Sequence, residues 1–146
     1  MARVIKSMSD LTKILESRIQ QALKMTQQEI FEVIQQHITD YYHEYTPHVY
    51  QRTWEFLNSL IKTDIIKSSN GLSCSVEIDK NYLSHKYKGG ITGRQAAIFA
   101  NQHSHGGVYD DDFGKFWDDA MAEIGLEPGI RAIMKDNLRK CGVPVL

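Results

Sequence analysis

Residues 9–46, SDLTKILESRIQQALKMTQQEIFEVIQQHITDYYHEYT, form the longest regular pattern in the chain. Apolar residues recur there at steps of about four, which places them on one face of an α-helix. They are Leu11, Leu15, Ile19, Leu23, Ile30, Ile34, Ile38 and Tyr42. No glycine or proline interrupts the stretch, Ser9 suits the N-cap, and Pro47 disfavours a helical residue before it. The sequence therefore predicts one amphipathic helix over about residues 9–45.

This helix is too long for a small domain to cover. A helix over residues 11–44 would span roughly 50 Å, because each residue adds about 1.5 Å. A chain of 146 residues folds into a domain narrower than that. We therefore expect the helix to bend, to break, or to pack on something outside its own chain, which is a first indication of self-association.

A period of two replaces the helical pattern after Pro47. Residues 72–78 alternate between apolar and polar side chains, which is typical of a half-buried strand. The segment from Leu60 to Ile66 is rich in β-branched residues, and Asn70-Gly71 is a strong turn signal between the two. The pattern predicts an antiparallel hairpin in a small sheet over about residues 58–88, with residues 82–87 as a candidate third strand.

A loop and two further helices complete the predicted fold. Residues 88–112 carry glycines at 89, 90, 93, 106 and 107, and only residues 96–100 form an apolar patch that suits a short helix. We expect this loop to become ordered against a neighbouring subunit or another part of an assembly, and a fixed surface loop packed on its own domain is the alternative. Helical spacing returns at about residues 113–141, divided by Gly125 and Pro128. The predicted fold is a single α+β domain: a long N-terminal helix, a small antiparallel sheet with a hairpin, and C-terminal helices packed on one face of the sheet.

The composition excludes several classes of protein. There are 17 basic and 18 acidic residues, and no basic run, which argues against sequence-specific nucleic-acid binding. No apolar run approaches the length of a transmembrane helix, and the N-terminus lacks a signal-peptide pattern. Cys74 and Cys141 form no CxxC pair, so we expect two reduced thiols that pack as small apolar residues.

One cluster of residues could carry metal chemistry. His103 and His105 stand two residues apart, and Asp110, Asp111 and Asp112 follow, so a small metal-dependent nuclease or toxin-like enzyme is an alternative. Acidic residues before an aromatic helix also suit plain interaction with the helix dipole, and we favour that interpretation. The sequence has no G-x-S-x-G motif, and residues 89–94 lack the Lys-Ser/Thr pair of a phosphate loop, so we expect no enzyme activity and no cofactor.

The segment from Tyr45 to Leu60 joins the predicted helix to the predicted sheet. Pro47, then Arg52-Thr53, then Ser59-Leu60 resemble the corresponding segment of the HK97-type tail-component family, the phage head–tail joining and tail-completion proteins. Residues 116–120, FWDDA, look like the start of that family's C-terminal helix, and residues 138–143 look like its closing helix. Trp54 departs from the pattern, because many members have glycine at this place.

The resemblance implies a structural protein of the phage particle. It implies a homo-oligomeric ring in the neck or at the tail end, assembled in the host cytoplasm, with portal-side connector or adaptor proteins and tail tube or tail terminator proteins as partners. The residues expected at its interfaces are Tyr50, Arg52, Trp54, Arg94, Ile98 and Phe99. The aromatic residues near Trp54 also suit a core, and the long helix also suits an adaptor domain with a coiled-coil arm.

Overall fold

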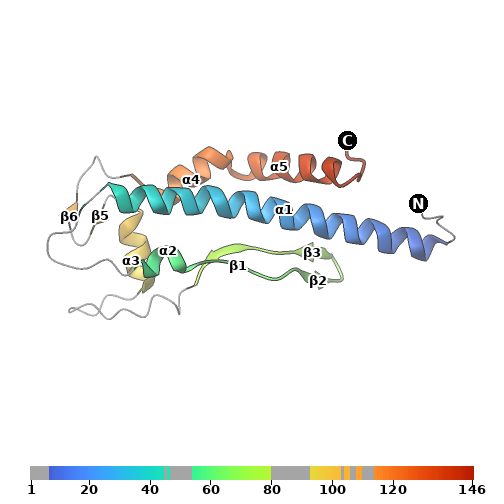
Figure 1. Cartoon of the computed structure of the whole chain (residues 1–146), viewed down its shortest axis with the longest axis horizontal. Helices are drawn as coiled ribbons and strands as arrows, with labels where there is room; N and C mark the ends of the chain where they lie inside the picture. Colours follow the sequence, from blue (N-terminus) through green and yellow to red (C-terminus); the bar gives the residue numbers. More distant parts are fainter. Residues whose placement is uncertain are drawn as a thin grey trace.

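The computed structural model describes residues 7–44, 46, 54–79, 93–102, 104–105, 108–109 and 114–146. Only the backbone is described for residues 93, 94, 96, 104–105 and 108–109. The fold is α+β, as the sequence predicts, and one long helix forms its axis (Figure 1). A β-ribbon lies along one side of this helix and two C-terminal helices lie along the other.

The long helix, α1 (Met8–His43), is continuous over 36 residues, or roughly 54 Å. Its N-cap is Ser7, whose hydroxyl accepts a hydrogen bond from the Asp10 amide at 3.1 Å. The expected cap, Ser9, is wrong because it already lies in the first helical turn, two residues beyond the extended backbone that a cap requires. The predicted long helix is otherwise confirmed.

The β-ribbon consists of two short ladders that follow one another. β1 (Leu60–Lys62) pairs with β4 (Val76–Ile78), and β2 (Ile66–Ser68) pairs with β3 (Gly71–Ser73), both antiparallel. The predicted hairpin is therefore confirmed. Ser69 and Asn70 form its two-residue turn, and Gly71 takes the positive φ of 136° that follows it. The candidate third strand at residues 82–87 lies outside the described residues.

The C-terminal helices are α4 (Phe116–Ile124) and α5 (Leu126–Lys140). They pack along α1 (Figure 1). The sequence pattern instead predicts that they pack on one face of the sheet. The helices pack along α1 because its apolar stripe is wide enough to contact the ribbon on one side and α4 and α5 on the other. The division predicted at Gly125 and Pro128 falls at Gly125 alone, because α5 begins at Leu126 and holds Pro128 in its first turn.

A tight junction joins α4 to α5. Gly125 caps α4 with a φ of 83°, and the next residue, Leu126, also has a positive φ of 55°. Gly129 then passes the end of α4 so closely that a Cβ there would lie 1.6 Å from the Ile124 carbonyl oxygen. Only glycine fits at position 129 without a backbone shift.

Short elements occupy the segments between these parts. α2 (Glu55–Asn58) precedes β1, and α3 (Gly93–Ala100) confirms the predicted short helix. β5 (Ser104–His105) pairs with β6 (Val108–Tyr109), which corrects the expectation of an irregular loop there. The rest of the predicted loop lies outside the described residues, and so does its expected ordering on assembly.

The hydrophobic core lies around the C-terminal half of α1. Its buried members come from α1, β1, α3 and α4: Ile34, Ile38, Leu60, Ala100, Phe116, Ala120 and Ile124. The first turns of α1 extend beyond the tip of the ribbon and beyond the end of α5 (Figure 1). The core therefore covers one end of the long helix and leaves the other end projecting.

Candidate interaction surface

The β-ribbon contains a β-bulge that α1 stabilises. Three residues, 63–65, separate the two ladders on one strand, whereas two residues, 74–75, separate them on the other. One extra residue of this kind bends and twists a ribbon. The buried Gln27 amide of α1 donates hydrogen bonds to the carbonyls of Thr63 at 2.9 Å and Ser75 at 2.7 Å. Gln27 thus attaches the ribbon to α1 at the point where the ladder is interrupted.

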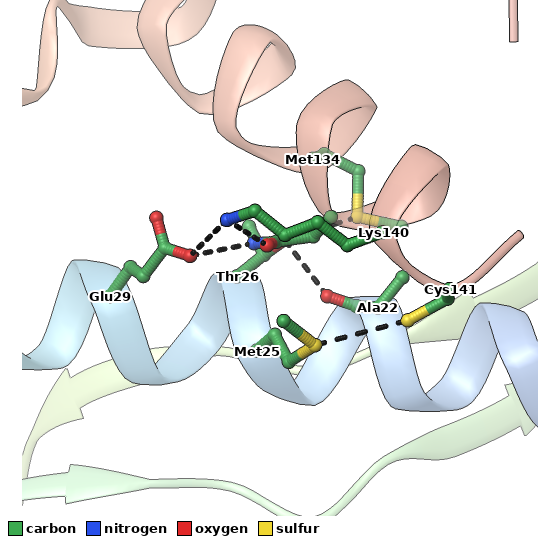
Figure 2. A network of polar contacts seen from close by, with 8 residues as sticks. Ala22, Met25, Thr26, Glu29, Met134, Lys140 and Cys141 are labelled. Carbon is green, nitrogen blue, oxygen red and sulfur yellow. Dashed lines mark hydrogen bonds and ion pairs between the residues drawn. The ribbon is translucent and has the colours of Figure 1, made fainter.

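A buried polar network attaches α5 to the opposite side of α1 (Figure 2). Asn137 is fully buried, and its amide nitrogen donates to the Thr26 hydroxyl at 3.2 Å and to the Glu29 carboxylate at 3.0 Å. Lys140 donates to the Asn137 side-chain oxygen at 3.2 Å and lies 3.8 Å from Glu29. The Thr26 hydroxyl donates to the Ala22 carbonyl at 2.9 Å. Because both groups of the Asn137 amide have partners, this network fixes the register of α5 along α1.

An apolar groove lies between these two attachments. It has a volume of about 310 Å³, and α1 forms its floor while the ribbon and the C-terminal helices form its walls. Its lining is Leu23, Thr26, Gln27, Ile30, Ile34, Cys74, Ser75, Val76, Trp117, Met121 and Ile130. Most of these side chains are only half-buried, so the groove exposes apolar surface. Exposed apolar concavities of this kind mark binding sites for small molecules or for side chains of a partner.

Cys74 is the reactive residue type in this groove. Burial raises the pKa of its thiol, because desolvation disfavours the thiolate. A thiol with a raised pKa is a poor nucleophile at neutral pH. Cys74 therefore contributes apolar lining, in line with the sequence prediction of a packed thiol.

The aromatic residues near the C-terminal end of α1 belong mainly to the core. Phe56 and Phe116 meet edge to face with ring centroids 4.9 Å apart, and Tyr41 lies 6.0 Å from Phe56. Trp54 differs, because its side chain is 43% exposed. Its φ is positive, at 60°, and its ring centroid lies 4.7 Å from that of Tyr42. The core interpretation holds for Tyr41, Tyr42 and Phe56, and Trp54 has surface available for an interface.

The other predicted interface residues are only partly described. Ile98 is 45% exposed on α3 and Phe99 beside it is half-buried. Arg94 lies in α3 with its backbone alone described, while Tyr50 and Arg52 lie outside the described residues. Trp54, Ile98 and Phe99 are therefore the members of the predicted interface whose side chains the structure places.

The predicted metal cluster falls largely outside the described residues. His103 and residues 110–112 are not described, and His105 is described by its backbone in β5. Within the part of the chain that is described, no three His, Cys, Asp or Glu side chains converge as metal ligands. The metal-dependent alternative stays a prediction.

The projecting end of α1 is the second exposed apolar surface. We call residues 8–15 the overhang, because the first polar tertiary contacts along the described part of α1 come from Glu16 and Arg18. Glu16 pairs with Lys67 near the ribbon tip at 2.6 Å, and Arg18 donates to the Gly142 carbonyl after α5 at 3.1 Å. Met8 in the overhang is 76% exposed.

The family model YomN matches residues 7–140, which is most of the chain. The chain belongs to the YomN family. This family is phage-associated, so the prediction of a phage protein is confirmed at that level. None of the curated proteins and none of the solved structures matches the chain. Among the helices that the structure describes, none combines the length and the apolar character that a membrane crossing requires.

Sequence reasoning missed the residues that assemble the groove. Gln27 and Asn137 are amides in amphipathic helices, and such residues are usually solvated. A signal for Gln27 was nonetheless present, because it lies between Leu23 and Ile30 on the apolar side of the helical pattern. No sequence signal indicated that Trp117 and Met121 would face Val76 across α1.

Proposed function

We propose that this YomN-family chain is a non-enzymatic structural protein of a tailed-phage particle, and that it assembles into a ring at the neck or the tail end. The observation that carries the proposal is the long α1, whose overhang lies outside the chain's own core. A helix end with exposed apolar side chains is stabilised when a partner covers it. Cyclic assembly is the usual way in which identical subunits cover such surfaces.

The proposed partners follow from this position in the particle. They are further copies of the chain, a portal-side connector or adaptor protein, and a tail tube or tail terminator protein. The half-buried groove and the exposed Trp54 and Ile98 side chains supply apolar surface for more than one of these contacts. The phage association of the family supports the same reading.

The test is to measure which proteins the purified particles contain and to locate this chain in them by electron microscopy. Mass spectrometry of purified particles should find the chain at a fixed multiple of the portal protein. Electron microscopy with a tag on the C-terminus should place it at the junction of head and tail or at the tail end. Removal of its gene should leave heads and tails that do not form infectious particles. A chain absent from particles, with normal particles in its absence, would contradict the proposal.

A further inference from the structure

The junction between α4 and α5 holds a leucine in a strained conformation. Gly125 has a φ of 83°, and Leu126 beside it has a φ of 55°, a left-handed backbone that leucine rarely adopts. Leu126 is also 59% exposed, so its side chain gains little from burial in return. Strain of this kind persists where the surrounding structure imposes it, and it is found at segments that switch between conformations.

The close approach of α5 to the end of α4 imposes this strain. A Cβ at Gly129 would lie 1.6 Å from the Ile124 carbonyl oxygen, so the first turn of α5 starts directly against α4. Pro128 has no N–H to donate to that carbonyl, as a continuous helix would require, so α4 and α5 cannot merge into one straight helix. The junction is therefore a hinge at residues 125–126, and it has to bend in order to bring α5 along the α1 of its own chain.

The contacts that attach α5 are all available on a second copy of the chain. Among the described residues, the buried core cluster has no member in α5, and the buried residue of α5 is Asn137. Its side chain bonds to Thr26 and Glu29 of α1, and Arg18 of α1 bonds to the Gly142 carbonyl after α5. Because these bonds run between α5 and α1, the α1 of another copy offers the same partners. α5 can therefore leave its own α1 without opening the core cluster.

We propose that neighbouring copies exchange α5: the hinge at residues 125–126 opens, and α5 packs on the α1 of the next copy. The partner is a second copy of this chain, because the exchanged contact is the one that α5 already makes within the chain. The difference between the two forms lies at the hinge, where Leu126 can leave the left-handed backbone once α5 no longer bends back. Short hinges under strain favour exchange for this reason.

Exchange of α5 also explains how copies could be joined in a ring. Each copy gives its α5 to the next, and head-to-tail contacts of this kind close into a ring when the rotation per subunit allows it. The inference rests on the proposed function as a self-assembling protein, and it names the element that joins neighbours.

A native contact between two sulfur atoms reports which α1 each α5 occupies. Cys141 Sγ lies 3.8 Å from Met25 Sδ on α1 (Figure 2). The experiment uses the full chain with Met25→Cys and Cys74→Ser, which leaves thiols at positions 25 and 141 alone. The protein, refolded at high concentration or purified in particles, is linked by oxidation or by a short bismaleimide and then run on a denaturing, non-reducing gel. Exchange should link most chains into multimers, whereas a chain closed on itself gives an intramolecular link.

The matched control places the new thiol where neither form brings it to Cys141. Ser9→Cys, in place of Met25→Cys, lies about 24 Å farther along α1, since each helical residue adds about 1.5 Å. It should give at least about tenfold less of either link. Links at this position equal to those at position 25 would show random collision and would overturn the assignment of the contact.

Substitutions at Leu126 test the hinge without a cross-link. They are compared by light scattering at the concentration at which half of the wild-type chains are exchanged. Leu126→Gly relieves the left-handed backbone of the closed chain and should lower the ratio of exchanged to closed chains by about tenfold. Leu126→Ile is β-branched and tolerates a positive φ less well, so it should raise that ratio several-fold. Leu126 lies outside the core cluster, so circular dichroism should show an unchanged helix content in both variants.

The contrary outcomes separate the exchange from the proposed function. Multimers whose links between positions 25 and 141 are all intramolecular would overturn the exchange and leave self-assembly standing. Equal ratios for the Gly, Leu and Ile chains would overturn the hinge as its cause. Exchanged multimers in solution, together with normal particles that lack the chain, would keep the exchange and overturn the proposed function. A chain that stays monomeric at high concentration and is absent from particles would overturn both.

Discussion

The two ends of α1 have the same amphipathic pattern but opposite surroundings. In the C-terminal half, Ile34 and Ile38 are almost completely buried between the ribbon and α4. In the N-terminal half, Met8 is 76% exposed, and no ribbon strand or C-terminal helix reaches the first turns (Figure 1). An apolar stripe thus specifies a helix and its buried face, but not which part of the molecule covers that face. The middle and the C-terminal part of α1 stabilise the fold, whereas the overhang projects beyond it.

The largest expected effect is the difference in stability between a substitution at the buried end of α1 and one in the overhang. Ile38→Ala should lower the free energy of unfolding by about 2–5 kcal/mol, because it leaves a cavity at a fully buried position. Leu11→Ala in the overhang should lower it by about 1 kcal/mol or less. Urea denaturation of the monomer measures both. Equal losses of unfolding free energy for the two variants would show that Leu11 is packed as tightly as Ile38, and that the overhang belongs to the core.

A smaller effect concerns the attachment of α5. Asn137→Ala should lower the free energy of unfolding by about 1–3 kcal/mol, because it leaves the Thr26 hydroxyl and the Glu29 carboxylate without a buried donor. Lys135→Ala on the exposed side of α5 is the matched control and should change stability little. Thermal or urea unfolding compares the two variants with the wild type. Equal stability of Asn137→Ala and the wild type would show that the network does not stabilise the fold.

The attachment of the ribbon should be weaker than that of α5. Gln27→Ala should lower the free energy of unfolding by about 1–2 kcal/mol, because the Thr63 carbonyl loses its side-chain donor while the Ser75 carbonyl keeps the Thr63 amide at 3.0 Å. The loss should be local, with faster hydrogen exchange of ribbon amides near Thr63 and unchanged exchange in α5. The exposed Gln21→Ala serves as the control. Uniformly faster exchange throughout the chain would mean that the ribbon and α5 unfold together.

The smallest effect concerns the first turn of the overhang. Ser7→Ala removes the N-cap and should reduce stability by about 0.5 kcal/mol, at the low end of cap losses because this end has no tertiary cover. Ser9→Ala, inside the helix, should have no measurable cost. Circular dichroism at 222 nm and exchange of the first amides report the difference. A larger loss in Ser9→Ala than in Ser7→Ala would restore Ser9 as the cap.

Local features were predictable because they depend on neighbours in the sequence. The spacing of Leu and Ile between residues 11 and 38 predicts α1, and Asn70-Gly71 predicts the hairpin. The cap was misplaced by two residues, because Ser7 and Ser9 are both suitable hydroxyls and only the backbone decides between them. Of the predicted interface, Trp54 and Ile98 are exposed, and the other side chains are half-buried or lie outside the described residues.

The sequence by itself determined the long helix and its excess length, the hairpin, the short α3, the C-terminal helices and the α+β class. It did not determine that α1 lies between the ribbon and the C-terminal helices, because a wide apolar stripe accepts packing from either side. Only the tertiary structure brings Cys74 and Val76 opposite Trp117 and Met121 to form the groove. These residues are about 40 positions apart in the chain, and contacts over such separations leave no periodic signal in the sequence.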